Sequence, residues 1–135
     1  QEEPKTALAG KFSVYYCAAL ALAEGAAGEN LFTDKRVLDP KMVALRKKVK
    51  ATIVPELKDT EANVTIIAKD GQKYSAFVNR PKGDPQNPPT DEELENKFRS
   101  LAAFVLPKKR IDSLVKILWA LDEVKDIRQL IRLCH

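Results

Sequence analysis

A proline-rich loop that runs directly into a helix constrains the fold more than any other part of this 135-residue chain. Residues 80–98 read RPKGDPQNPPTDEELENKF, with prolines at positions 81, 85, 88 and 89. Each proline fixes its backbone φ at about −65° and removes an N–H donor, so neither a helix nor a central strand can continue through the loop. A loop this stiff loses little entropy when it holds one shape, and it can keep Lys82 at a fixed position.

Thr90 and Glu93 predict where the helix after this loop begins. The Thr90 hydroxyl can accept a hydrogen bond from the first turn, and the Glu93 carboxylate can accept one from the Thr90 amide. The acidic residues at positions 91–93 also suit the positive end of the helix dipole. We expect a helix over 91–106 that ends before Pro107 and buries one apolar face, formed by Leu94, Phe98, Leu101, Ala102 and Val105.

A β-hairpin is predicted over residues 63–79, turning at Asp70-Gly71. A two-residue turn would mix polar and apolar side chains on both faces. A three-residue loop over 69–71, with Gly71 in the left-handed region, shifts the pairing by one residue. That register places Val64 and Ile66 on one face with the apolar residues of the second strand, so it is the one we predict.

The remaining segments complete an α+β pattern. The run 12–23 is apolar on almost every side, which favours a buried helix. Asp39-Pro40 marks the start of another helix, with Asp at the N-cap and Pro at the first helical position. Residues 51–57 read as a strand, and Pro55 restricts it to a sheet edge or a bulge. Two further helices are predicted near Ile111–Trp119 and from Asp126 onward.

We therefore expect a small antiparallel sheet, formed by an edge strand and the hairpin, packed with about five helices. Residues 1–10 are polar and are expected to be a tether. Residues 11–135 are expected to form a single α+β domain, since a chain of this length can bury one core. The chain opens with Gln1 rather than Met, so we expect it to be processed or a piece of a longer protein.

Composition restricts the environment and the partners. No apolar run approaches the roughly 18 residues of a membrane span. Cys17 and Cys134 lie far apart in apolar contexts, and we interpret both as reduced core thiols in a cytoplasmic protein, or in a mitochondrial matrix protein in a eukaryote. The net charge of +4 comes largely from a basic cluster within residues 35–50. Acidic residues lie among these charges and no aromatic residues alternate with them, which favours a solvated helix face over a nucleic-acid site.

Few side chains offer chemistry by themselves. His135 is the only histidine and the last residue, which makes it a poor general base. The chain has no Gly-rich phosphate loop and no metal-ligand spacing. Tyr15 and Tyr16 remain, and because they lie about 100° apart on a helix, one can enter the core while the other faces outward. An outward-facing phenol can donate a hydrogen bond to a carboxylate or an enolate.

Two segments resemble a known family. PKGDPQNPPTDEELENKF in the loop and KFSVYYCAALALAEG over 11–25 are similar to the C-terminal region of the MmgE/PrpD family, and the order of segments between them agrees. The resemblance covers roughly residues 4–133. It implies that the chain is the smaller α+β lid domain of a longer protein, whose large all-helical domain carries most of the proton-moving residues.

The resemblance also implies a chemistry and a site. Such proteins act on small di- and tricarboxylic acids by dehydration, decarboxylation or epimerisation, with no metal and no cofactor, and the expected parent is a homodimer. Phe12, Ser13 and Tyr16 match the family's FS-then-Tyr element, which faces the cleft between domains. On this basis Tyr16 is expected to be catalytic, with Ser13, Lys11 and Lys82 binding substrate.

Two other classes stay open at this point. The chain could be an orphan ligand-binding or protein-interaction module that kept the fold without catalysis, or a basic nucleic-acid binder that uses residues 35–50. Because the family's proton-moving histidines and lysines have no match in this sequence, we expect the isolated chain to be inactive on 2-methylcitrate and cis-aconitate.

Overall fold

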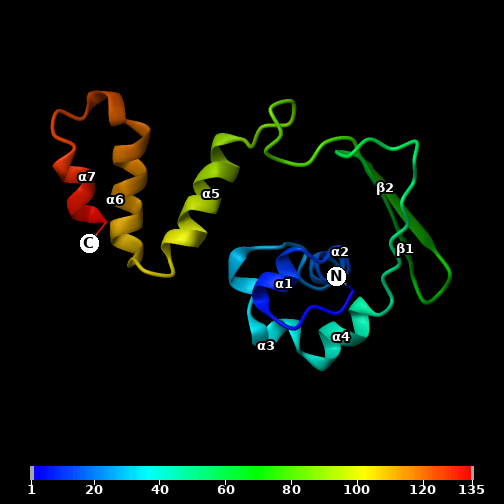
Figure 1. Ribbon diagram of the computed structural model, residues 1–135. Helices are drawn as coiled ribbons and strands as arrows, with labels where there is room; N and C mark the ends of the chain where they lie inside the picture. Colours follow the sequence, from blue (N-terminus) through cyan, green and yellow to red (C-terminus); the bar gives the residue numbers. More distant parts are fainter. Residues whose placement is uncertain (1, 135) are drawn as a thin grey trace. The chain divides into compact units, whose positions relative to one another are not determined.

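The structure is a computed structural model that describes residues 2–134. The chain divides into two compact units, residues 1–55 and 56–135. Each is described by itself, and the expected single domain over 11–135 stays a prediction. The described residues form seven α-helices and one two-stranded antiparallel sheet, which confirms a small α+β fold (Figure 1).

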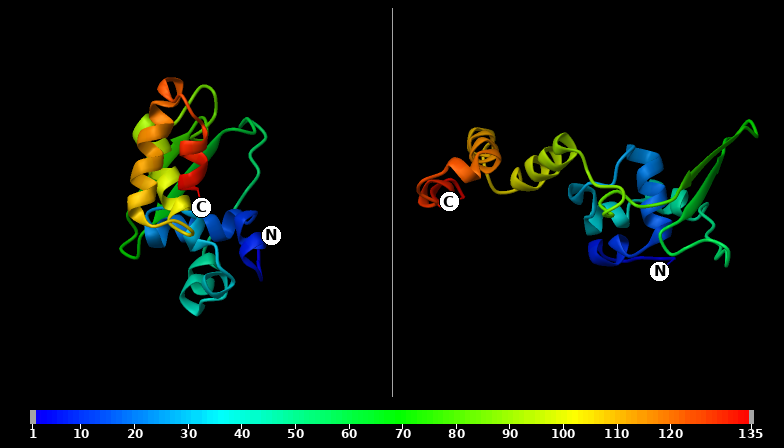
Figure 2. Two further views of the ribbon diagram at one scale, coloured as in Figure 1. Left: turned by 90° about the vertical axis from the view of Figure 1, so that its left-hand side faces the viewer. Right: turned by 90° about the horizontal axis from the view of Figure 1, so that it is seen from above.

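Four short helices make up the first unit. They are α1 (Ala7–Lys11), α2 (Val14–Glu24), α3 (Asp34–Val37) and α4 (Pro40–Arg46), with a 3₁₀ turn η1 (Glu29–Leu31) between α2 and α3. Figure 2 shows these helices gathered in one group. Side-chain caps start all four, from Thr6, Ser13, Thr33 and Asp39. The Asp39 carboxylate accepts the Lys41 amide at 2.8 Å, and Pro40 follows it at the first helical position, as predicted.

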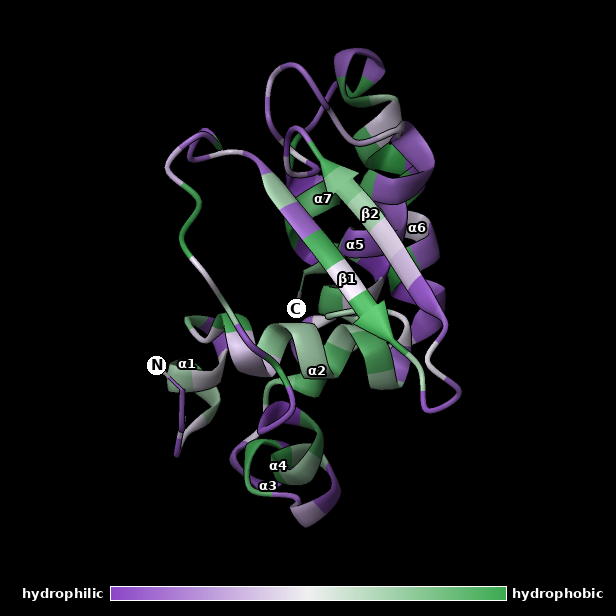
Figure 3. Ribbon diagram, turned by 90° about the vertical axis from the view of Figure 1, so that its right-hand side faces the viewer, coloured by the Kyte–Doolittle hydropathy of each residue, from purple (hydrophilic) through white to green (hydrophobic). Residues whose placement is uncertain are grey.

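The core of the first unit lies between α2, α3 and α4. Its buried side chains are those of Tyr16, Ala19, Leu20, Val37 and Met42. The helix α2 is apolar along most of its length (Figure 3), but only one of its faces is buried. Val14 and Leu22 stay more than half exposed, so the expectation of a buried helix holds for one face of α2 only.

The expected tether does not describe the packing of residues 4–10. Residues 7–11 form α1, and Gly10 is buried so close to Val37 and Tyr16 that an added Cβ would lie 3.0 Å from a Val37 methyl carbon. Pro4 is buried as well, and its carbonyl accepts a bond from Arg46. Polar composition suggested a loose segment, whereas these long-range contacts hold it in the first unit.

The second unit begins with the hairpin β1 (Ala62–Ile67) and β2 (Lys73–Val78). Val64 pairs with Ala76 and Ile66 with Tyr74, which confirms the predicted three-residue loop and register. Gly71 has a φ of 86°, the left-handed conformation that this loop requires. The predicted strand over 51–57 does not form: the sheet has two strands, and Ile53 is 93% exposed. Pro55 offers no N–H to a neighbouring strand.

Three helices and a turn complete the second unit, α5 (Asp91–Ala102), α6 (Lys108–Trp119), η2 (Leu121–Glu123) and α7 (Arg128–Leu133). Thr90 and Glu93 form the predicted capping box, with the Glu93 carboxylate 2.7 Å from the Thr90 amide nitrogen. The helix α5 ends four residues before the expected Leu106. None of its side chains is buried, although its pattern predicted an apolar buried face.

A charged network joins α5 to α6. Glu95 accepts bonds from Arg99 Nε at 2.7 Å and from the Trp119 indole N–H at 3.1 Å, and Arg99 also pairs with Asp112. The Arg99 guanidinium, followed by the Trp119 bond, holds the pKa of Glu95 below its ordinary value of 4.5. The two helices therefore share polar contacts that depend on an ionised carboxylate, in addition to the buried Ile111, Leu114 and Val115 of α6.

Thr90→Ala should expose the first turn of α5. Loss of this cap costs about 1 kcal/mol, so exchange of the protected amides at the start of the helix should become about fivefold faster. Amide hydrogen exchange followed by NMR measures this. Thr90→Ser should retain protection, and Ser100→Ala, on the exposed surface of the same helix, is the matched control. Equal protection in Thr90→Ala and the parent chain would contradict the capping role.

Acidification should break the Glu95–Trp119 contact. A lowered pKa means that the folded state favours the ionised carboxylate, so the contact is present above pH 4.5 and is lost as the pH falls through the lowered pKa. Trp119 is the only tryptophan, so its fluorescence reports this step directly. Glu95→Gln should abolish the transition, and an unchanged transition in that variant would assign it to another group.

Candidate functional site

Tyr15 and Tyr16 are neighbours near the start of α2, and their side chains point in different directions. Ser13 caps the helix by accepting the Tyr16 amide at 3.2 Å, which fixes the first turn. One side chain then enters the core and the other does not, as successive residues lie about 100° apart. Tyr16 is the core residue and Tyr15 is the one that is partly exposed.

The Tyr16 side chain is fully buried. Its hydroxyl donates a 3.0 Å hydrogen bond to the Leu31 carbonyl, and its ring meets Phe32 edge to face at 5.8 Å. Burial raises the pKa of this phenol. The expectation that Tyr16 faces an open cleft is therefore corrected, because the apolar core surrounds its ring and a backbone carbonyl accepts the hydrogen bond from its hydroxyl. Its catalytic role stays a prediction that this placement does not favour.

Ser13 and Lys11 are also engaged within the first unit. Ser13 is fully buried, and its hydroxyl serves the helix cap. Lys11 is exposed and pairs with Glu29. The structure thus brings three of the four expected site residues to the α1–α2 junction, but as structural contacts of that junction. Their predicted role in substrate binding stays a prediction.

Lys82 belongs to the second unit. Its ammonium group lies 3.1 Å from the Glu93 carboxylate of the capping box, which ties the proline-rich loop to α5. Asp84 accepts the Gln86 amide at 2.8 Å and pairs with Arg80, so the loop is closed by its own side chains. This agrees with a stiff loop, and it gives Lys82 a structural partner.

The basic cluster of residues 35–50 is only partly a solvated face. Arg36 pairs with Glu24 and Asp39. Arg46 is 4% exposed, and its guanidinium donates to the Pro4 carbonyl at 3.4 Å. The expectation of solvation is wrong for Arg46, because it follows Met42 by one helical turn on the buried side of α4. That spacing was the signal in the sequence that could have predicted its burial.

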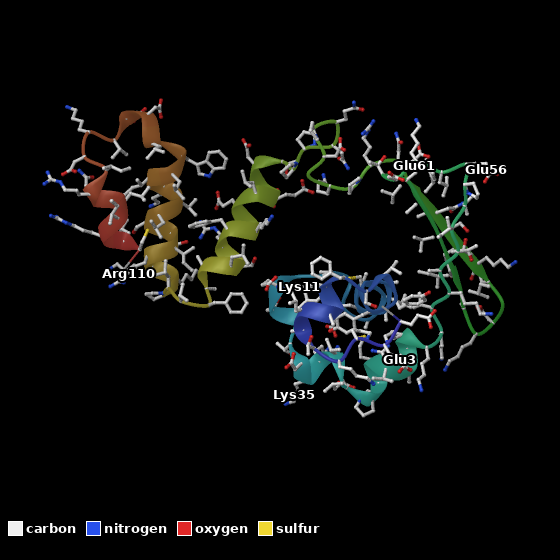
Figure 4. All side chains as sticks on the ribbon, viewed as in Figure 1. Glu3, Lys11, Lys35, Glu56, Glu61 and Arg110 are labelled. Carbon is white, nitrogen blue, oxygen red and sulfur yellow. The ribbon has the colours of Figure 1, made fainter. Side chains whose placement is uncertain are left out.

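Arg46 lines a hollow of about 450 Å³ that we call the basic hollow. The charged and phenolic side chains that line it are those of Glu2, Glu3, Tyr15, Arg46, Lys47 and Lys50. Figure 4 labels Glu3, which lies beside α4. Tyr15 donates a 3.1 Å hydrogen bond to the Glu2 carboxylate, and that bond raises the pKa of the Tyr15 phenol. Cations, a phenol and two carboxylates therefore converge on a surface that contains none of the four residues expected to form the site.

A second, apolar groove of about 410 Å³ lies on the second unit, along α5 and α6. Leu94, Phe98, Leu118 and Trp119 line it. This is the face that the pattern of α5 predicted to be buried, and in the described structure it is open. Such a face suits packing against another surface more than polar chemistry.

Metal and thiol chemistry find little support in the described residues. Within residues 2–134, no three His, Cys, Asp or Glu side chains gather closely enough to hold a metal ion. Cys17 is partly buried, and burial raises the pKa of its thiol. Cys134 is exposed, so its assignment as a core thiol is wrong.

No described helix has the length and apolar character needed to cross a bilayer.

Comparison with known proteins places the chain in a family. Residues 1–122 match the MmgE/PrpD C-terminal domain. A cis-aconitate decarboxylase of Mus musculus is 28% identical over 127 residues, covering 91% of this chain and 26% of that protein. A cis-aconitate decarboxylase of Aspergillus terreus is 28% identical over 143 residues, covering 100% of this chain and 29% of that protein.

The chain belongs to the MmgE/PrpD family, and it corresponds to the C-terminal domain of that family. This confirms the resemblance carried by the FS-then-Tyr element and the proline-rich loop. The chain spans a little over a quarter of the length of the two decarboxylases.

Removal of the phenolic hydroxyl should lower the stability of the first unit at Tyr16 but not at Tyr15. Tyr16→Phe leaves the Leu31 carbonyl without its donor, so the first unit should lose about 1 kcal/mol of stability. Tyr15→Phe, whose hydroxyl contacts only an exposed carboxylate, should leave stability unchanged. Urea unfolding followed on the Val37 and Met42 methyl resonances measures both. Equal stability of the two variants would contradict the assignment of Tyr16 to the core.

Proposed function

We propose that the chain is the C-terminal lid domain of a cofactor-independent lyase or isomerase that acts on a small di- or tricarboxylic acid. The observation that carries the proposal is the match to the family's C-terminal domain over residues 1–122. The two named relatives are cis-aconitate decarboxylases, so decarboxylation of cis-aconitate is the first reaction to test. Dehydration of 2-methylcitrate is the other family reaction that we keep.

The exposed apolar residues of the first unit support a lid. Leu8, Phe12, Val14 and Leu22 are each more than half exposed, and Phe12 reaches 77%. Side chains of this kind are what a domain buries when it closes over a partner. We propose that the partner is the large helical domain of the family, in a homodimeric cytoplasmic or matrix enzyme. Closure would exclude water from the bound acid.

The proposal assigns most of the proton chemistry to that partner domain. The only histidine of the chain is its last residue, and none of the lysines of the described first unit is buried. What the lid supplies is enclosure and cationic groups at its polar surface. The isolated chain should therefore bind or cover an acid without transforming it.

A domain exchange tests this function. The segment of mouse cis-aconitate decarboxylase that aligns with this chain is replaced by the chain, and turnover of cis-aconitate is compared with that of the truncated mouse enzyme. We expect the chimera to be faster by about tenfold or more, because closure restores a preorganised, water-excluded site. The isolated chain should show no turnover.

Two controls make the result decisive. Size-exclusion chromatography and circular dichroism identify chimeras that are folded, and the same exchange in the Aspergillus terreus enzyme gives a second scaffold. A folded chimera that is no faster than the truncated enzyme, in both scaffolds, would contradict the lid assignment. Turnover by the isolated chain would contradict the division of labour between the domains.

A further inference from the structure

The basic hollow combines three cations that have no carboxylate partner. Among residues 2–134, neither Arg46 nor Lys47 nor Lys50 forms an ion pair, whereas Arg36 and Lys11 do. Glu3 lies on the hollow but is 3.9 Å from the ammonium group of Lys5. Unpaired positive charge that converges on a concave surface attracts anions and raises their local concentration.

Arg46 is the most informative of these cations. A buried guanidinium is costly unless its donors and its charge are both satisfied. The 3.4 Å bond to the Pro4 carbonyl uses one of its five N–H donors and provides no negative charge. An arginine fork fits a carboxylate through two parallel hydrogen bonds, which a point charge such as lysine cannot offer. Burial also holds this side chain in place before a ligand arrives.

A carboxylate already occupies part of the basic hollow. The Glu2 side chain accepts the Tyr15 hydroxyl at 3.1 Å, so the site holds the group that a carboxylic acid would present. Glu2 belongs to the same chain, and an intramolecular carboxylate competes with any free acid for the Tyr15 donor. The hollow, at about 450 Å³, lies within the size range of small-molecule sites.

The geometry points to a binding site for a small di- or tricarboxylate in the basic hollow, where Tyr15 and Arg46 hold one carboxylate, Lys47 and Lys50 attract the others, and Glu2 occupies the position until the ligand displaces it. The inference rests on the proposed function for the class of acid. It adds the location of the site, the residues that form it and the internal competitor. Tyr16 has only an indirect part, since its burial sets the direction of Tyr15.

Titration of the full chain with tricarballylate, a stable tricarboxylate, tests the site by NMR. The resonances of Tyr15 and Lys47 should shift in a saturable manner. Lys47→Gln/Lys50→Gln should weaken binding about tenfold, as expected for two exposed charge pairs. Glu2→Gln should tighten binding about threefold, if the competitor covers the site most of the time.

Matched controls separate the site from general charge effects. Lys108→Gln/Lys109→Gln removes two exposed charges in the second unit, and Glu56→Gln removes one exposed carboxylate there; neither should change the affinity. Equal weakening in the two lysine double variants, or no effect of Glu2→Gln, would overturn the inference. Inorganic phosphate that binds as tightly as tricarballylate would overturn the carboxylate assignment.

The test also separates this inference from the proposed function. Tricarballylate binding needs no turnover, so it can succeed when the chimeras are inactive, which would leave a binding module without the lid role. Active chimeras together with no binding in the basic hollow would keep the lid and reject the site. Tyr15→Phe gives one further check: it should weaken binding, and an unchanged affinity would remove Tyr15 from the site.

Discussion

Burial of the Tyr16 side chain is the contact on which the first unit depends. Its ring lies among Gly10, Val37 and Phe32, and its hydroxyl satisfies the Leu31 carbonyl. A single side chain thereby joins α1, α2, α3 and the η1 turn. Gly10 is required beside it, because a larger residue would collide with Val37 and the Tyr16 ring. With the Tyr16 side chain buried, the neighbouring Tyr15 side chain, about 100° around the helix, lies outside the core.

The basic hollow is one consequence. With Tyr16 in the core, Tyr15 projects to the other side, where α4 places Arg46 and Lys47. The family resemblance implies a site at Tyr16, Ser13 and Lys11, and in the structure these residues form contacts of the α1–α2 junction. A lid that bound acids through Tyr15 and a buried arginine would add positive charge around the substrate, and in the function we propose the groups that move protons would lie in another domain.

The parts of the fold that depend on residues close in the sequence were predictable. The parts that depend on packing between distant residues were not. The Thr90 capping box, the Asp39-Pro40 helix start and the hairpin register each depend on residues a few positions apart, so the sequence was sufficient. The strand expected over 51–57 failed because it needs a partner strand, and Pro55 weakens any candidate. The helix α5 shows the same limit: its apolar stripe was predicted, but the stripe does not reveal what covers it. The burial of Arg46 was not predicted, because the exposure of a charged residue depends on neighbours that are distant in the sequence. Helix geometry left Tyr15 and Tyr16 both open, and only the structure shows that Tyr15 is the outward one.

Chemical modification of the tyrosines tests the central assignment most directly. Acetylation of the chain by N-acetylimidazole, read by peptide mass spectrometry, distinguishes Tyr15 from Tyr16 in the same fragment. The account predicts that Tyr15 reacts, that Tyr16 stays unmodified in the folded chain, and that tricarballylate slows the reaction of Tyr15. Preferential modification of Tyr16, with Tyr15 protected in the absence of any acid, would contradict both the core assignment and the site built on it.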